Sequence, residues 1–248
     1  MHIILAIRPS ILQAHPTLEE LTLSLLPEHL PRDLVSALKA EQKDSLESGK
    51  SILCPNLRRS GGCDEGLQLF LPNRRIECVA SFWCGAEHIH EMDQHVSVWL
   101  NPILKPSYQR IRVLEVWANQ DDCISFLPTI APYLTSLTYL FICDDIRILA
   151  EDSGDYDLSS AFGQLRTLQS ITLSSVGEES EDITIVDIEE VVQIVWGVLP
   201  EIREIFIGLE ERGIVCYRYT KEEGMQSKVI SPTVACRPYT RWLSDSCA

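Results

Sequence analysis

A cluster of cysteine and histidine residues is the first candidate for chemistry in this sequence. Five of them follow the spacing C-x5-C-x3-H-x-H-x4-H, with two more cysteines upstream: Cys78, Cys84, His88, His90 and His95, preceded by Cys54 and Cys63. Structural zinc sites take four such ligands, usually as two close pairs. This spacing matches no tight zinc knuckle, so buried thiols with surface imidazoles are the favoured interpretation. A metal-binding or hydrolytic protein built on the cluster is the alternative.

The sequence motifs of common enzyme classes are absent from the chain. It contains no G-x-S-x-G, no P-loop, no dinucleotide-binding glycine pattern and no H-E-x-x-H. Acidic pairs are abundant, but abundance in acidic segments carries no positional information. We therefore expect no catalytic residue, no metal, no cofactor and no enzymatic activity.

Acidic residues are concentrated in one part of the chain. Residues 115–211 hold 20 acidic and 3 basic side chains, and the whole chain has a net charge of -15. This charge excludes a nucleic-acid-binding protein that neutralises phosphates over its whole surface. Acidic pairs recur just after the expected strands: Asp121-Asp122, Asp144-Asp145, Glu178-Glu179 with Glu181-Asp182, and Glu210-Glu211. They predict an acidic rim for a Lys/Arg-rich protein partner, and solvated loops are the alternative.

The elements that would position these residues follow from one short phrase, apolar-x-x-apolar-x-apolar. Its four regular copies begin at Ile111, Leu137, Leu168 and Ile202, and their central residues lie 26, 31 and 34 positions apart. Such recurrence is typical of a leucine-rich solenoid, in which each unit adds one strand and returns through a helix or loop. We expect strands at 113–117, 139–143, 170–174 and 204–208, and return helices at 122–134 and 183–198.

The outward positions of these strands form a second candidate binding surface. Side chains alternate between the two faces of a strand, so the residues between the apolar positions point away from the core. Strands in register would place four aromatic residues in one stripe: Trp117, Tyr139, Phe141 and Phe206. Exposed aromatic residues often anchor protein interfaces. The stripe is therefore a predicted partner-binding site, and its coverage by the C-terminal tail is the alternative.

The N-terminal part of the chain is less regular. Leu18-x-x-Leu21-x-Leu23 matches the phrase, and apolar spacing predicts a helix from Pro31 to Lys43. Farther on, polar residues follow Leu57, and Gly61-Gly62 is expected to break the chain. Half of the phrase returns at Ile76-x-x-Val79.

Two further expectations concern the segments on either side of the regular repeats. A helix is expected at 93–104, ended by Pro102 and Pro106. After Arg212, a final strand at 214–219 precedes a turn-rich tail. We expect this tail to cap the solenoid, because an open end would expose core residues.

Composition indicates a globular intracellular protein. Hydrophobic residues make up 45% of the 248 positions, which is ample for a sizeable core. No apolar run approaches the roughly 18 to 20 residues that span a bilayer, and Ile3–Ile7 is too short for a signal-peptide core. The nine cysteines lack the density of a disulfide scaffold. We expect reduced thiols, no membrane partner, and a cytoplasmic or nuclear location.

Three stretches resemble a known family. Pro16–Leu23, Cys54–Leu57 and Leu134–Leu140 are similar to the strand starts of irregular leucine-rich repeats in F-box proteins of filamentous and mushroom-forming fungi. The resemblance extends over roughly residues 10–210 and implies, by analogy, a substrate-recruiting arm of a cullin-type ubiquitin ligase.

The chain also departs from the pattern of that family. It starts inside what resembles a repeat, and no second and third F-box helices follow Leu30–Leu34. A cullin adaptor is therefore an expected partner only if an F-box is present.

The sequence as a whole predicts one α/β domain over residues 1–248. It would be a leucine-rich-repeat solenoid with parallel strands on its concave face: irregular repeats at 1–110, regular repeats at 111–210 and a C-terminal cap at 211–248. The expected function is that of a non-enzymatic protein–protein interaction scaffold. The alternative remains a metal-binding or hydrolytic protein using the Cys78–His95 cluster.

Overall fold

The structure, a computed structural model, describes much of the chain in separate stretches. These are residues 17–23, 32–48, 53–62, 64–72, 74–82, 104–117, 127–143, 162–175, 185–199, 201–209, 215–220 and 224–230. They belong to two compact units. One comprises Ile4–Trp117 with Thr129–Leu137, and the other chiefly Thr138–Ala248 with Ala118–Pro128.

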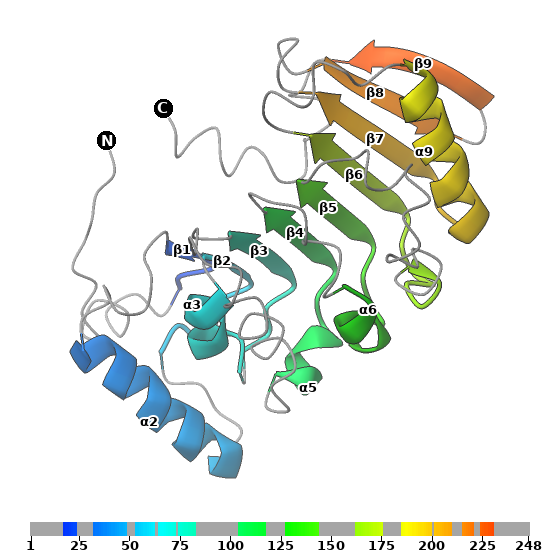
Figure 1. The fold of residues 1–248 in the computed structure, drawn as a ribbon. Coiled ribbons are helices and arrows are strands. Elements are labelled where there is room, and N and C mark those ends of the chain that lie inside the picture. Colours follow the sequence, from blue (N-terminus) through cyan, green and yellow to red (C-terminus); the bar gives the residue numbers. More distant parts are fainter. Residues whose placement is uncertain are drawn as a thin grey trace, which may run out of the picture. The chain divides into compact units, whose positions relative to one another are not determined.

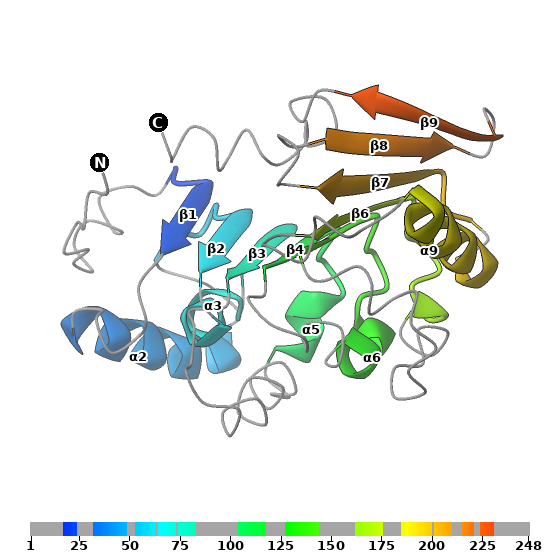
Figure 2. The same ribbon diagram turned by 45° about the horizontal axis from the view of Figure 1, so that its top comes forward.

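In its described residues, the first unit, the β1–β4 unit, has four parallel strands that pair in sequence order. They are β1 (Glu20–Leu23), β2 (Arg59–Gly62), β3 (Cys78–Phe82) and β4 (Val113–Trp117). Its helices are α2 (Arg32–Ser48), α3 (Asp64–Phe70), α5 (Lys105–Tyr108) and the 3-10 helix η3 (Ala131–Tyr133). The α-helices α2, α3 and α5 lie on one side of the strands (Figures 1 and 2). The short α6 (Leu127–Ile130) falls where the chain divides between the two units.

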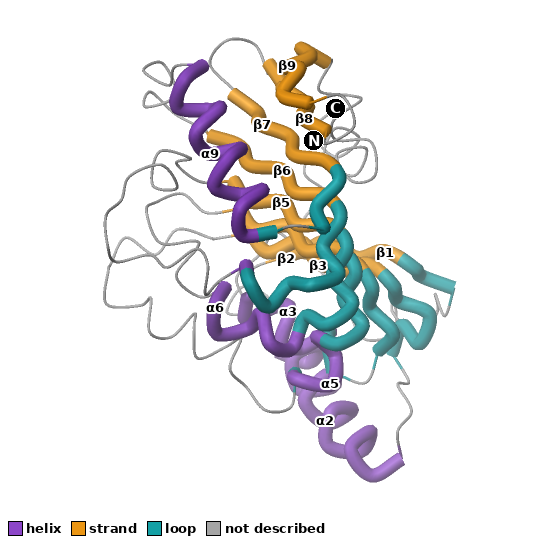
Figure 3. The backbone as a smooth tube through the Cα atoms, turned by 90° about the vertical axis from the view of Figure 1, so that its right-hand side faces the viewer, coloured by secondary structure: helices purple, strands orange, loops and turns teal. Residues whose placement is uncertain are grey.

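The second unit, the β5–β9 unit, has three parallel and two antiparallel strands among its described residues. Strands β5 (Tyr139–Cys143), β6 (Ser170–Ser175) and β7 (Glu204–Leu209) are parallel. Strands β8 (Val215–Thr220) and β9 (Gly224–Ile230) then pair antiparallel to their predecessors. The helix α9 (Ile185–Val198) runs along one face of these strands (Figure 3).

Cores form where the apolar positions of the strands meet in register. In the β5–β9 unit, one row joins Leu140, Ile171, Ile205 and Tyr219, and each of these side chains is 0% exposed. Fully burying a side chain of this size contributes about 1.5–3 kcal/mol. Buried residues Ile188, Val191, Val192 and Val195 of α9 have helical spacing and lie on one face of that helix.

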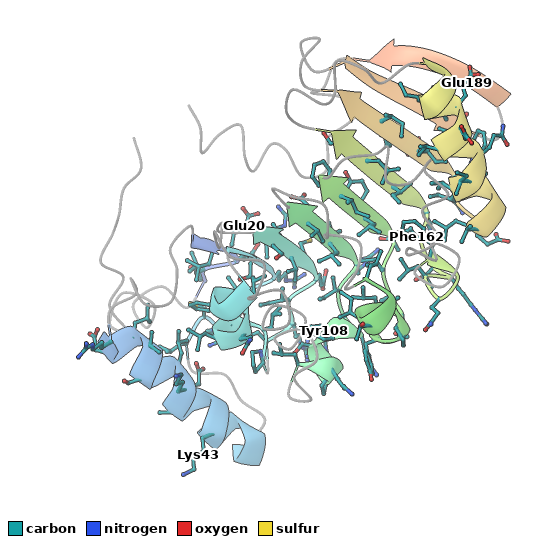
Figure 4. The ribbon with its side chains drawn as sticks, in the orientation of Figure 1. Glu20, Lys43, Tyr108, Phe162 and Glu189 are labelled. Carbon is teal, nitrogen blue, oxygen red and sulfur yellow. The ribbon has the colours of Figure 1, made fainter. Side chains whose placement is uncertain are left out.

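Aromatic residues outside the strands also enter the cores. Tyr108 of α5 in the β1–β4 unit and Phe162 in the β5–β9 unit are each 1% exposed or less (Figure 4). On the surface of the β1–β4 unit, the Lys105 ammonium lies 4.6 Å from the centroid of the Tyr133 ring. This cation–π contact ties α5 to η3.

The strand predictions for the regular repeats are confirmed. Strands β4, β5, β6 and β7 cover the predicted positions, and β6 and β7 each extend one residue farther. The predicted helices at 31–43 and 183–198 correspond to α2 and α9. The return helix predicted at 122–134 is shorter in the described residues, where α6 and η3 cover Leu127–Tyr133.

The prediction that Gly61-Gly62 breaks the chain is wrong. Arg59–Gly62 is strand β2, paired in parallel with β1 on one side and β3 on the other. Ser60 and both glycines are buried. They pair in register with Val79, Ala80 and Ser81 of β3. Backbone pairing with two neighbours thus overrides the poor strand propensity of this segment.

Two other expectations concern the segments beside the regular repeats. Residues 93–103 of the helix predicted at 93–104 lie outside the described residues, so its end at Pro102 and Pro106 stays a prediction. Pro106 itself sits in the first turn of α5, where a missing N–H is tolerated. In the tail, the expected strand at 214–219 corresponds to β8, but the turn-rich cap contains a further strand, β9.

The fold class is therefore α/β with mostly parallel strands. Among the described residues, no helix combines the length and apolar character that crossing a bilayer requires.

Candidate functional site

The predicted aromatic stripe is buried where its side chains are described. Tyr139, Phe141 and Phe206 are 7%, 6% and 7% exposed. Strand register places Phe141, Thr172 and Phe206 side by side, and the Tyr139 hydroxyl lies 2.9 Å from Thr172 Oγ1. The expectation that these three rings are exposed is thus wrong, because each side chain is buried. Their contact with a partner stays a prediction, and the Trp117 side chain lies outside the described residues.

The predicted acidic rim lies entirely outside the described residues. This holds for Asp121, Asp122, Asp144, Asp145, Glu178, Glu179, Glu181, Asp182, Glu210 and Glu211. Its attraction for a basic partner stays a prediction.

The predicted cysteine–histidine cluster is described only in part. Cys63, Cys84, His88, His90 and His95 lie outside the described residues, and those that are described contain no group of three potential metal ligands. Cys54 and Cys78 are free thiols. Burial is the main cause that raises the pKa of both. A raised pKa disfavours the thiolate, which is the form that binds metals and attacks electrophiles.

A regular polar edge precedes the parallel strands, and we call it the leading edge. It consists of the residues that directly flank the first buried apolar position of each phrase. In the β1–β4 unit, the Glu19 carbonyl accepts bonds from the N–H groups of Arg58 and Arg59, at 2.9 and 3.0 Å. The Glu77 carbonyl likewise accepts from Arg112 and Val113, at 2.8 and 3.1 Å. These bonds extend the backbone pairing of the strands by one residue into the leading edge.

The same pattern recurs in the β5–β9 unit. The Thr138 carbonyl accepts from Gln169 and Ser170, and the Gln169 carbonyl accepts from Arg203 and Glu204, at 2.8–3.2 Å. The backbone is therefore paired one residue before each of these strands begins. This placement determines which side chains of the leading edge are neighbours.

A pocket opens on the leading edge of the β1–β4 unit, and we call it the arginine pocket. It has a volume of about 470 Å³ and is lined by Arg75, Glu77, Arg110, Arg112 and Ser136. All three arginines are exposed, whereas Glu77 and Ser136 are partly buried. The pocket therefore presents three positive charges and one negative charge in a chain whose net charge is -15.

Two buried isoleucines separate these charged residues along the chain. Ile76 lies between Arg75 and Glu77, Ile111 lies between Arg110 and Arg112, and both isoleucines are buried at 1% and 0% exposure. Each buried isoleucine thus stands between two residues that reach the surface, with Arg110 in a hydrogen-bonded turn and the others in the short segments that lead into β3 and β4. Neighbouring strands lie about 4.8 Å apart, which is within the reach of long arginine side chains.

The backbone of the preceding turn anchors the second arginine. Arg110 Nη1 donates to the Arg74 carbonyl at 3.5 Å, and the Arg110 N–H donates to the Ser107 carbonyl at 3.1 Å. Within the described parts of the chain, neither Arg75 nor Arg110 is in an ion pair. A guanidinium keeps its charge at all ordinary pH values and donates up to five hydrogen bonds. The pocket is thus suited to holding an anionic group.

Sequence reasoning did not single out the arginine pocket. Its signal is a charged residue on each side of the first apolar position in two successive phrases, Arg75-Ile76-Glu77 and Arg110-Ile111-Arg112. Only half of the phrase is present at Ile76, which lies 35 positions before Ile111, so the sequence alone does not show that the two charged sets are neighbours. Strand pairing between β3 and β4 makes it visible.

No model of a protein family and no curated protein matches the chain.

Proposed function

We propose that this chain is a non-enzymatic protein-interaction scaffold of the leucine-rich-repeat kind. The observation that carries the proposal is the repetition of one structural step. Strands β2, β3, β4, β6 and β7 each follow a buried apolar residue and a paired backbone position, so these steps present side chains in a repeated arrangement. A regular, firmly held array of outward side chains is what repeat proteins use to bind other proteins.

The proposed docking surface is the leading edge of the β1–β4 unit, centred on the arginine pocket. Arginine is enriched at protein interfaces, where it forms charge-assisted hydrogen bonds over a large contact area. The three exposed arginines favour an acidic partner segment at this surface. The acidic rim, in the same proposal, would meet a basic segment.

Binding fits the chemistry of the pocket better than catalysis does. The five lining residues are three arginines, one glutamate and one serine. A guanidinium stays protonated under ordinary conditions and so does not serve as a general base, and a serine needs an adjacent base to act as a nucleophile. These groups can hold and orient an anion, which is a recognition role.

The resemblance to fungal F-box proteins extends the proposal to substrate recruitment for a cullin-type ubiquitin ligase. This extension rests on the resemblance alone. It predicts that the cullin adaptor is captured together with the partner in the experiment that follows.

The test is an affinity capture with two matched charge reversals. Immobilised wild-type chain is compared with Arg110→Glu/Arg112→Glu in the pocket and with Arg166→Glu/Arg203→Glu in the β5–β9 unit. All four arginines are exposed. Each variant replaces two of them by glutamate, so both variants change the net charge equally. Captured proteins are identified by mass spectrometry, and the interaction is repeated with the purified partner at low and high salt.

We expect the pocket variant to lose the partner and the control variant to retain it. Binding should also weaken with salt, because exposed charges are screened over about 8–10 Å at physiological ionic strength. Equal capture by all three proteins would contradict the proposed docking surface.

A further inference from the structure

We propose that the arginine pocket recognises a phosphate monoester carried by a protein segment. This inference rests on the proposed function and specifies the chemical group that the partner inserts. It is built on the pocket's charge, its hydrogen-bond donors, its volume and its location.

The charge of the pocket matches a phosphate monoester. Three guanidinium groups and the Glu77 carboxylate leave two net positive charges among the lining residues. A phosphorylated side chain carries a charge of about -1.5 to -2 at neutral pH. A single carboxylate would leave the pocket with excess positive charge, so the dianion is the better match.

The donors of the pocket also suit a phosphate. Guanidinium groups bind phosphate oxygens in pairs through parallel N–H bonds. Arg75, Arg110 and Arg112 approach from two neighbouring strands, and the Ser136 side chain can add a hydroxyl donor. Three phosphate oxygens can thereby be engaged from different directions, whereas a planar carboxylate offers two.

The volume and location of the pocket favour a phosphorylated segment over free phosphate. The volume of about 470 Å³ exceeds what one phosphate group occupies, which leaves room for the side chain and backbone that carry it. Arg58, on the leading edge before the neighbouring strand β2, is exposed, as are the three arginines of the pocket itself. A passing chain can therefore reach it.

A nucleic acid is the less suitable occupant. Its backbone repeats a negative charge at every nucleotide, and binding requires an extended basic surface. This chain has a net charge of -15, and three arginines in one pocket neutralise only a few phosphates. A single phosphate group on a protein brings fewer negative charges toward this acidic chain than the backbone of a nucleic acid does.

The experiment is a ³¹P NMR titration with the full chain, in which two phosphorus-containing probes are observed and an unmodified peptide serves as competitor. They are a short Gly/Ala peptide with one central phosphoserine, the same peptide with unmodified serine as competitor, and inorganic phosphate. We expect the phosphopeptide resonance to shift and broaden, and the unmodified peptide not to compete. Inorganic phosphate should bind at least about tenfold more weakly, since it lacks the contacts of the carrier segment.

Four single substitutions test the location of the site. Arg75→Gln and Arg110→Gln should each weaken phosphopeptide binding by about tenfold or more, because each removes charge-assisted bonds. Arg203→Gln is the matched control, since Arg203 has the same position before β7 that Arg112 has before β4. It should leave binding unchanged. Glu77→Gln should tighten binding severalfold by removing the one negative charge from the pocket.

The proposal is overturned if wild-type protein fails to bind the phosphopeptide or if Arg203→Gln weakens binding as much as Arg110→Gln. It is also overturned if inorganic phosphate binds as tightly as the phosphopeptide, which would identify a site for free phosphate. If phosphate binding fails while partner capture still depends on Arg110 and Arg112, the inference falls and the scaffold proposal stands. If the phosphopeptide binds but capture ignores those arginines, the inference about the pocket stands and the proposed docking surface falls.

Discussion

Arg74 and Glu41 form a buried ion pair inside the β1–β4 unit, with 2.6 Å between Arg74 Nη2 and Glu41 Oε2. Their side chains are only 2% and 7% exposed. Arg74 also donates from Nε to the Leu53 carbonyl and from Nη1 to the Phe70 carbonyl, both at 3.0 Å. The Leu53 N–H donates to Glu41 Oε1 at 2.7 Å. The pair therefore links α2, the end of α3 and the segment before β2.

Burial has a measurable cost for this arginine. Desolvation lowers the pKa of Arg74, and attraction to Glu41 acts in the opposite direction. The carboxylate and the carbonyl acceptors together compensate a charge that would otherwise be unfavourable in the core. The same turn also supports the arginine pocket, because the Arg74 carbonyl accepts the bond from Arg110.

Arg74→Met is expected to lower the free energy of unfolding by about 3–5 kcal/mol, since it leaves the Glu41 carboxylate buried without its partner. Urea unfolding monitored by circular dichroism measures the change. Arg59→Met is the control, because the Arg59–Glu20 pair is exposed, with both side chains 44% exposed. The control should change stability by less than about 1 kcal/mol. Similar losses for the two variants would contradict the buried role of Arg74.

Phe141→Ala is expected to lower the free energy of unfolding by about 3–5 kcal/mol, the usual loss when a buried phenylalanine is truncated. The same unfolding measurement applies. Thr172→Val should cost about 1–3 kcal/mol, because it removes the hydrogen-bond partner of the buried Tyr139 hydroxyl. An unchanged stability for Phe141→Ala would instead indicate an exposed ring, as the original stripe hypothesis requires.

Stability should fall as the pH rises above about 9, because burial raises the pKa of Cys54 and Cys78 above the ordinary value of 9.0. In that range the unfolded thiols lose protons before the folded ones do, so the unfolded state binds fewer protons and is favoured. Below about pH 9 the thiols are protonated in both states and this contribution to stability is fully present.

The measurement is the free energy of unfolding of wild type and of Cys54→Ala/Cys78→Ala, from neutral pH to about pH 10. We expect wild type to lose more stability than the variant above about pH 9 and an equal amount below it. Parallel curves across the whole range would show that the two thiols do not titrate differently on folding.

Gly197→Ala is expected to stabilise the β5–β9 unit by about 0.4–1 kcal/mol. Gly197 is an exposed residue of α9, and an added Cβ would meet no atom within 4 Å. Alanine lowers the entropy of the unfolded chain and favours the helix. Thermal unfolding measures the gain.

Gly208→Ala supplies the contrast on β7. Its added Cβ would lie 3.1 Å from Ser174 Oγ, which is closer than an ordinary contact. We expect no gain in stability unless Ser174 is also changed to glycine. A gain from Gly208→Ala alone would mean that Ser174 moves aside without cost.

Local side-chain patterns determined the parts of this fold that were predicted correctly. The strands β4 to β7 each combine three apolar residues at fixed spacing, as in Leu168, Ile171 and Leu173, and all three are buried at 1% exposure or less. The helix α9 shows its apolar face within its own residues. The sequence of such an element is enough to predict it, because the spacing of the apolar residues on its buried face distinguishes a strand from a helix.

Tertiary pairing decided the rest. The segment Arg59–Gly62 has no strand pattern of its own and becomes β2 because β1 and β3 supply hydrogen bonds on both sides. Only the burial of Phe141 and Phe206 shows that the predicted stripe is not an open surface. The arginine pocket exists because the pairing of β3 with β4 aligns Glu77 with Arg112, which are 35 residues apart. Periodicity encodes which face of an element is apolar, but the neighbours of that face are determined by hydrogen bonds between distant segments.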